Sequence, residues 1–94
     1  MAGFRVTAVV DGDTFDVTPN WVWEGRNGCR VRPTGYDAPE IGTPGGQAAR
    51  AKLERLILGM QIEFRAAHRA DRGRLVSDVF LNGRNLTDYF PEYR

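Results

Sequence analysis

The sequence predicts a mainly β protein of the α+β class, a five-stranded Greek-key barrel capped by a helix. Short segments alternate apolar and polar residues, as strands that bury one face do. Turn-forming pairs such as Asp11-Gly12 and Asn82-Gly83 separate these segments. One amphipathic helical pattern falls between the third and fourth expected strands, and this order fits a small closed sheet.

The first three expected strands form a meander. Residues 4–10 alternate, the Asp11-Gly12 turn follows, and residues 13–17 resume the alternation, which predicts a hairpin with Asp13 beside the turn. Pro19-Asn20 interrupts this second strand, and residues 21–23 continue it as strand or loop. A turn over residues 24–28 leads to the third strand at residues 29–32.

The second half begins with the helix and ends with two more strands. Thr43-Pro44 predicts a helix start, because a hydroxyl N-cap precedes proline at the first helical position. Gly59 predicts its end. We expect a fourth strand at residues 60–65, a charged loop at 68–74, a fifth strand at 75–81 and a short helix at 85–90.

Length and composition limit the possible functions. With 94 residues, we expect one domain over residues 1–94. The net charge of +1 gives no general polyanion signal, so nucleic-acid binding requires local clustering of cations. A single cysteine, Cys29, excludes an internal disulfide and a cysteine-based zinc site, and the single histidine, His68, has no partner motif.

Localisation and assembly are expectations only. No segment has the length and apolarity of a membrane span, and the N-terminus lacks a secretory signal pattern. We expect no membrane association, a monomer, and a cytoplasmic location unless the chain was cut from a secreted precursor.

The stretch over residues 32–40, Arg-Pro-Thr-Gly-Tyr-Asp-Ala-Pro-Glu, stands out because it combines charges of both signs with two prolines. Proline lacks a backbone donor and biases the preceding residue toward an extended conformation, so a strand end feeding a stiff loop is expected. Such a loop is either a functional site or a solvated turn with one salt bridge.

Two aspartates near strand ends are candidate metal ligands. If the meander brings Asp13 and Asp37 together, two carboxylates about 4 Å apart repel by roughly 4 kcal/mol at an intermediate dielectric. A hard divalent cation relieves this repulsion, and calcium takes oxygen ligands of this kind. The alternative is that each aspartate caps a local turn, which explains Asp11 better than Asp13.

Arg32, Arg74 and Glu40 are candidates for phosphate chemistry. A guanidinium group grips phosphate through two parallel hydrogen bonds and can stabilise a phosphorane-like transition state. Glu40, held by Pro39, could accept a proton from attacking water. The alternatives are a solvated loop charge for Arg74 and an interaction with the helix N-terminus for Glu40.

In this order, the residues resemble the staphylococcal nuclease-like family, or thermonucleases. The resemblance rests on Asp11-Gly12-Asp13-Thr14, on residues 32–40 and on Gly73-Arg74, and it covers about residues 4–90. It implies an OB-fold nuclease that cleaves single-stranded DNA and RNA with calcium.

The resemblance also implies residue roles. Asp13, Asp37 and the Ala38 carbonyl correspond to metal ligands. Arg32 and Arg74 correspond to phosphate-binding catalytic arginines, and Glu40 to the catalytic glutamate, conventionally a general base. The ion could equally be another divalent cation, because magnesium and manganese take similar oxygen ligands.

This chain departs from the family at three places. Arg72 stands where the family often has a tyrosine, so a substrate contact is lost or replaced there. The second hairpin is extended and carries Trp21 and Trp23. The chain ends soon after Tyr93, without the further C-terminal helix of longer members. Tyr36 or the tryptophans could stack on bases, although tryptophan on a hairpin more often covers the core or a partner surface.

Two functions of different classes follow. The first is a calcium-dependent nuclease that hydrolyses phosphodiester bonds of unpaired DNA or RNA, and every family catalytic position is filled. The second is a non-catalytic OB-fold module that binds nucleic acid or protein.

Overall fold

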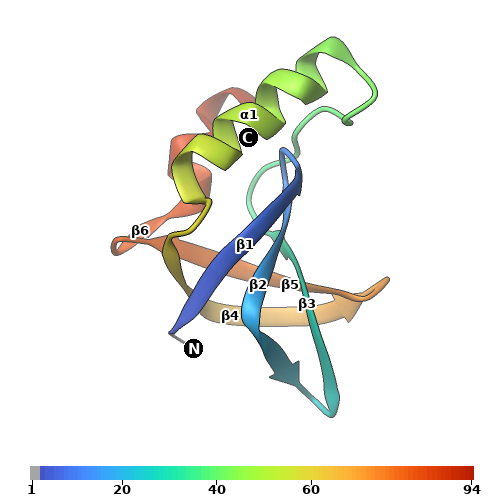
Figure 1. Ribbon diagram of the computed structural model, residues 1–94, viewed down its shortest axis with the longest axis vertical. Coiled ribbons are helices and arrows are strands. Elements are labelled where there is room, and N and C mark those ends of the chain that lie inside the picture. Colours follow the sequence, from blue (N-terminus) through green and yellow to red (C-terminus); the bar gives the residue numbers. More distant parts are fainter. Residues whose placement is uncertain (1–2) are drawn as a thin grey trace.

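The computed structural model describes residues 3–94 and confirms the α+β fold class, a closed five-stranded barrel of the OB type with one capping α-helix. The barrel strands are β1 (Phe4–Asp11), β2 (Thr14–Trp23), β3 (Arg26–Pro33), β4 (Gln61–Asp71) and β5 (Arg74–Leu81). They follow the order β3-β2-β1-β4-β5, and a parallel pairing of β3 with β5 closes the sheet (Figure 1). A two-residue strand, β6 (Arg84–Asn85), extends the end of β5.

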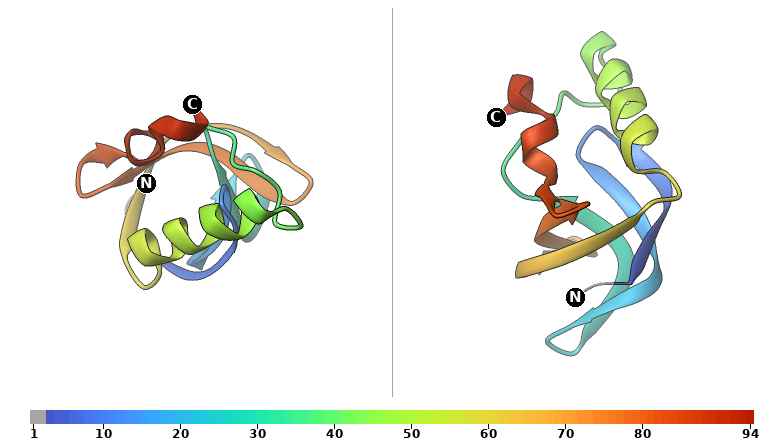
Figure 2. Two further views of the ribbon diagram at one scale, coloured as in Figure 1. Left: turned by 90° about the horizontal axis from the view of Figure 1, so that it is seen from above. Right: turned by 90° about the vertical axis from the view of Figure 1, so that its left-hand side faces the viewer.

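The helix α1 (Pro44–Ile57) begins where the Thr43-Pro44 pair predicts. The Thr43 hydroxyl accepts a hydrogen bond from the Gly46 N–H at 3.1 Å, which satisfies one of the free donors of the first turn. Ala49, Leu53 and Ile57 are buried on one face. Figure 2 shows α1 lying over one end of the barrel, so this face closes the core there.

Inward-facing residues of the strands and the chain end complete the core. Phe15, Val31 and Leu75 are fully buried on three neighbouring strands. Two short 3-10 helices, η1 (Leu86–Tyr89) and η2 (Pro91–Tyr93), follow β6, and Leu86 and Phe90 pack into the same core. The helix expected at residues 85–90 is therefore present in 3-10 form, and a second short turn follows Pro91.

Three sequence-based boundaries were wrong. The turn expected over residues 24–28 is confined to Glu24 and Gly25, because β3 begins at Arg26 and residues 26–28 pair with β2. The strand β2 continues through Pro19-Asn20 to Trp23, because its pairing with β3 is irregular between Asp16 and Trp21 and leaves room for a residue without an N–H donor. The charged segment expected as a loop at residues 68–74 is mostly strand, since β4 runs to Asp71. His68, Arg69 and Arg72 are exposed, whereas Ala67 and Ala70 pack on the core and the register shifts between Ala67 and Arg69.

The two tryptophans of the extended hairpin differ in position. Trp21 is 1% exposed and donates its indole N–H to the Arg30 carbonyl at 2.8 Å, so the core interpretation holds for it and base stacking does not. Trp23 is partly buried against the core. Within residues 3–94, no helix has the length and apolarity to cross a membrane.

Candidate functional site

Three segments that are far apart in the sequence meet at one cavity of about 250 Å³. They are the β1–β2 turn, the loop that follows β3, and the first residue of β5. The residues that line the cavity are Asp11, Asp13, Arg32, Asp37, Ala38, Pro39, Glu40 and Arg74. The expected metal-ligand positions and the three expected catalytic residues therefore lie around a single space.

The closing strand pair brings two of these segments together. In the parallel register of β3 with β5, Arg30 is opposite Arg74 and Arg32 is opposite Val76. The loop after β3 is held by the Thr34 N–H, which donates to the Ser77 carbonyl at 3.0 Å. Barrel closure thus places Arg32 and Arg74 on adjacent strands at one end of the sheet.

Asp13 is the buried carboxylate of the cavity. It is 7% exposed, accepts the Ala38 N–H at 3.1 Å and pairs with the Arg32 Nη1 at 3.0 Å. Burial raises the pKa of the Asp13 carboxyl and the Asp11 side chain adds to this, whereas the Ala38 N–H and Arg32 oppose it. Asp13 therefore links the β1–β2 turn to the loop, which a solvated turn cap would not do.

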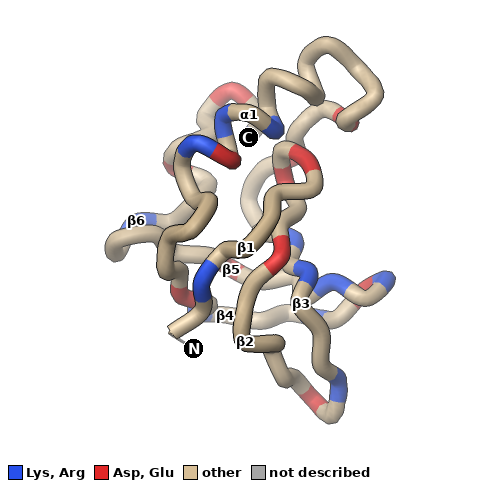
Figure 3. The backbone as a smooth tube through the Cα atoms, viewed as in Figure 1, with Lys and Arg blue, Asp and Glu red and all other residues tan. Residues whose placement is uncertain are grey.

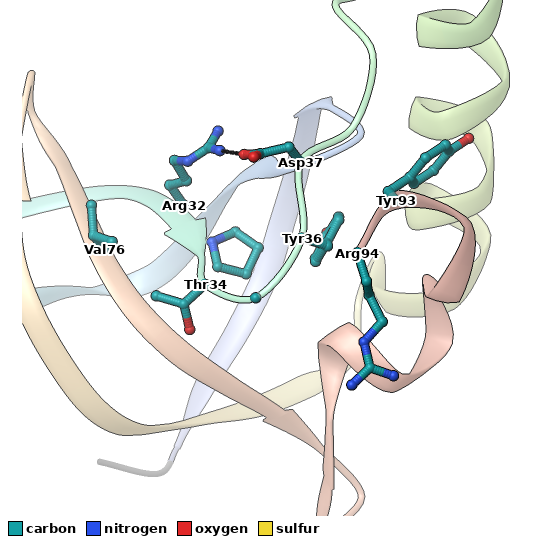
Figure 4. Close-up of a pocket in the computed structure, with 9 residues that line it drawn as sticks. Arg32, Thr34, Tyr36, Asp37, Val76, Tyr93 and Arg94 are labelled. Carbon is teal, nitrogen blue, oxygen red and sulfur yellow. Dashed lines mark hydrogen bonds and ion pairs between the residues drawn. The ribbon is translucent and has the colours of Figure 1, made fainter.

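Arg32 connects the two candidate metal ligands. One guanidinium nitrogen faces Asp13, and the Nη2 donates to the Asp37 carboxylate, whose side chain is largely exposed. Figure 4 shows the Arg32–Asp37 contact across the mouth of the loop. A guanidinium group has five N–H donors, so donors remain for a further anion.

Arg74 has unused binding capacity. Its Nε is buried and has no hydrogen-bond partner among the described residues, and its nearest acid is Asp71 at 3.9 Å. An unpaired buried donor costs about 1–3 kcal/mol. An acceptor that enters the cavity would remove this cost.

Glu40 lies at the rim and is exposed. Its carbonyl accepts hydrogen bonds from the Thr43 N–H at 3.0 Å and the Thr43 hydroxyl at 2.7 Å. Within residues 3–94, the Glu40 carboxylate makes no hydrogen bond or ion pair. The alternative expectation was that Glu40 interacts with the helix N-terminus, and in the structure its backbone carbonyl makes that interaction. The carboxylate itself is free to act on a ligand.

The tyrosine of the loop is part of the core. Tyr36 is 4% exposed, donates its hydroxyl to the Gly12 carbonyl at 2.9 Å and stacks on Phe90 with ring centroids 4.5 Å apart. Burial raises the pKa of Tyr36 far above its ordinary value. The Tyr36 ring packs on Phe90 and its hydroxyl joins the loop to the β1–β2 turn, and Tyr36 also lines a cavity on the other side of Arg32. Contact of Tyr36 with a substrate stays a prediction.

A second cavity of about 310 Å³ lies on the other side of Arg32, between the loop and the chain end (Figure 4). Val76 of β5 lines one side of it, and Tyr93 and Arg94 of the chain end line the opposite side. Arg72, the other expected substrate contact, lines neither cavity; it is exposed at the tip of the β4–β5 turn with a φ of 56°.

Sequence reasoning assigned Asp11 to the turn alone. Its carboxylate does accept the Asp13 N–H at 3.0 Å, as a turn cap would, and Asp11 also lines the cavity. The spacing of two residues within one turn, with Gly12 between them, was the available signal. The sequence did not reveal that both sides of this turn face the same space.

The donor set suits a hard cation. Four carboxylates and two guanidinium groups line the cavity, so its lining has an excess of negative charge. All available ligand atoms are oxygens, which calcium and magnesium prefer. No group of three or more His, Cys, Asp or Glu side chains within residues 3–94 could hold an ion alone, so a cation would need two carboxylates, the Ala38 carbonyl and water.

Comparison with known proteins identifies no family, so any function must be argued from the geometry of the cavity. The chain matches no family model and no curated protein.

Proposed function

We propose that this protein is a divalent-cation-dependent nuclease of the staphylococcal nuclease-like type that hydrolyses phosphodiester bonds of unpaired DNA or RNA. The observation that carries this proposal is the convergence of Asp13, Asp37, Glu40, Arg32 and Arg74 on one cavity. These residues come from three separate segments, and a merely solvated set of loop charges has no reason to share one space.

Each side chain has a distinct task. The unpaired Nε of Arg74 and the remaining donors of Arg32 bind the phosphate from two adjacent strands. Guanidinium groups favour the more highly charged transition state over the ground-state diester, which lowers the barrier. Glu40, whose carboxylate is unpaired, accepts a proton from the attacking water.

Asp13, Asp37 and the Ala38 carbonyl would hold the cation. A bound calcium ion would supply positive charge to a phosphate oxygen and lower the pKa of nearby water. The negative excess of the lining favours a cation there.

Digestion of single-stranded DNA with calcium and with a chelator tests the proposal. We expect cleavage only with calcium, and a loss of about 10²–10⁴-fold in Glu40→Gln, the usual size of a general-base contribution. Glu63→Gln is the control, because Glu63 is on β4, pairs with Arg65 and lies outside the cavity. Equal digestion by wild type and Glu40→Gln would overturn the assignment of Glu40, and no digestion by wild type would overturn the nuclease.

A non-catalytic binding module is the competing function. The exposed position of Arg72 and the small size of the cavity fit binding as well as they fit turnover. Binding without hydrolysis in the same assay would favour it.

A further inference from the structure

Positive charge gathers where β3 passes the tip of the β4–β5 hairpin. Arg32 and Arg74 of this cluster line the cavity of about 250 Å³, and its other arginines do not. Residues 26–33 and 69–74 contain six arginines and one acidic residue, Asp71, whereas the whole chain has a net charge of only +1. Figure 3 shows blue segments along β3 and at this hairpin tip. The local clustering that nucleic-acid binding requires is therefore present on one side of the barrel.

The strand register connects this cluster to both cavities. Arg69 on β4 is opposite Val76 on β5, and Val76 is opposite Arg32 on β3. Adjacent strands are about 4.7–4.9 Å apart, and directly opposite residues point to the same face of the sheet. Arg69 and Arg32 therefore flank Val76, which is part of the wall of the second cavity.

Arg26 reaches the same place from the other hairpin. Its Nη1 donates to the Ala70 carbonyl at 3.0 Å, one residue from Arg69. This bond joins the start of β3 to the end of β4 and brings two arginines from distant parts of the sequence together.

The arginines differ in how far their charge is neutralised. Arg30 pairs with Asp16 at 3.0 Å, and Arg32 and Arg74 face the acids already described. Arg26 and Arg69 are exposed and make no ion pair within residues 3–94. Their guanidinium groups are the unneutralised part of the cluster, with Arg72 beside them at the turn.

We propose that Arg26 and Arg69 bind phosphates of a single-stranded nucleic acid outside the position that is cleaved. The inference rests on the proposed function and specifies its substrate as a polynucleotide that runs from the cavities across the outer face of β5 and β4. A row of guanidinium groups complements the regular charges of a phosphate backbone. A flexible single strand can leave a cavity of about 250 Å³ and continue over this curved surface.

Binding without turnover tests this surface. The probe is a fluorescent oligodeoxythymidylate of about 16 nucleotides, the upper site size of one OB fold, and a chelator prevents cleavage while anisotropy is measured over a range of salt. The slope of log K against log salt is about −0.7 per neutralised phosphate for single strands. Arg26→Gln and Arg69→Gln should each make it shallower by about 0.7, and the double variant by about 1.4.

Arg55→Gln is the matched control, because Arg55 is exposed on α1 and has no ion pair within the described residues. Its slope should equal that of wild type. Arg26→Gln also removes the hydrogen bond to the Ala70 carbonyl, so this variant is checked by circular dichroism. If its fold has changed, the result of Arg69→Gln alone decides the test. An unchanged slope in Arg69→Gln overturns the proposal.

Two further readings separate the alternatives. A poly-glutamate peptide of equal charge should bind more weakly than the oligonucleotide, and equal affinity would assign the surface to acidic proteins and overturn the proposal. Hydrolysis is assayed separately with calcium. If the wild-type protein binds with the predicted slopes but does not cleave, the proposed binding surface is supported and the proposed nuclease function is overturned. If the wild-type protein cleaves but both variants have unchanged slopes, the nuclease function is supported and the binding surface is overturned.

Discussion

Arg32 controls the charge balance of the cavity. It bridges Asp13 on the β1–β2 turn and Asp37 on the loop, so its positive charge offsets the repulsion between these two carboxylates. A substitution at Arg32 would therefore change folding and phosphate binding together. Glu40 is a cleaner probe of chemistry, because its carboxylate makes no interaction within residues 3–94 that supports the fold.

Gly46 gives a sharp test of how α1 positions Glu40. A Cβ at this position would lie 1.7 Å from the Glu40 carbonyl oxygen, which is backbone and cannot move aside alone. We expect Gly46→Ala to cost about 1–3 kcal/mol of unfolding free energy, the usual cost of overpacking, as measured by urea denaturation.

Gly42→Ala is the control for this prediction, since a Cβ there meets nothing within 4 Å. Its stability should stay within about 0.5 kcal/mol of wild type. A Gly46→Ala protein as stable as the control would mean that the helix start does not press on the Glu40 backbone.

Residue types were predictable from the sequence, but their contacts were not. Acidic and basic residues next to turns pointed to Asp13, Asp37, Arg32 and Arg74 because rigid charged loops need partners. The burial of Tyr36 was not predictable, because an aromatic ring between prolines has no periodicity that shows which face it covers. The second role of Asp11 depends on a cavity formed by three distant segments.

At the scale of elements, the loop after β3 is anchored to β5 by a small polar network. The Thr34 hydroxyl donates to the Asp78 carboxylate, and the His68 Nε2 is 3.0 Å from the same oxygen. These hydrogen bonds, that of Thr34 first, lower the pKa of the Asp78 carboxyl below its ordinary value. A lowered pKa means that the folded state favours the charged carboxylate.

The sign of the pH dependence follows from this shift. Stability contributed by Asp78 is present above its unfolded-state pKa near 3.8 and is lost as the pH falls through the lower folded-state value. We expect Asp78→Ala to lower the free energy of unfolding by about 1 kcal/mol at pH 7, since the pair is partly exposed, and the difference from wild type to shrink as the pH falls below 3.8. Urea denaturation of wild type and variant at pH 7 and at pH values below 3.8 measures this difference in unfolding free energy.

Asp88→Ala serves for comparison, because Asp88 only approaches Arg84 at 4.0 Å on the surface. It should change stability by less than about 0.5 kcal/mol. A deficit in Asp78→Ala that stays constant down to low pH would show that packing, and not the charge of Asp78, anchors the loop.

The pattern of elements was largely predictable. Alternation predicted β1, the start of β2 and the start of β4, the Asn82-Gly83 turn marked the end of β5, and the Thr43-Pro44 pair predicted the start of α1. Besides the early start of β3 at Arg26, the errors fell at Pro19-Asn20 and at residues 68–71. In both places the strand continues although local chemistry opposes it, because irregular pairing tolerates proline and an exposed hairpin arm tolerates charge.

At the scale of the whole molecule, a bound cation should stabilise the folded state. A ligand at a hundred times its dissociation constant adds about 2.7 kcal/mol, and 1 kcal/mol shifts the melting temperature of a domain of this size by about 4–8 °C. We expect calcium to raise the melting temperature by about 10 °C or more at saturation, measured by scanning calorimetry.

Asp13→Asn should lose most of this shift, while Asp88→Asn, outside the cavity, should keep it. Equal calcium shifts in the two variants would indicate ion binding elsewhere on the surface and would remove Asp13 from the ligand set.

The parallel pairing of β3 with β5 has a consequence for when the proposed activity would arise during folding. This pairing joins residues about forty positions apart, and such distant contacts form late because the intervening chain must first be ordered. Arg74 meets the other cavity residues only through that step. A nascent chain without β5, or a chain whose last strands have detached, therefore contains the other cavity residues but has no assembled site. The proposed hydrolysis would begin when the barrel closes and cease when it opens.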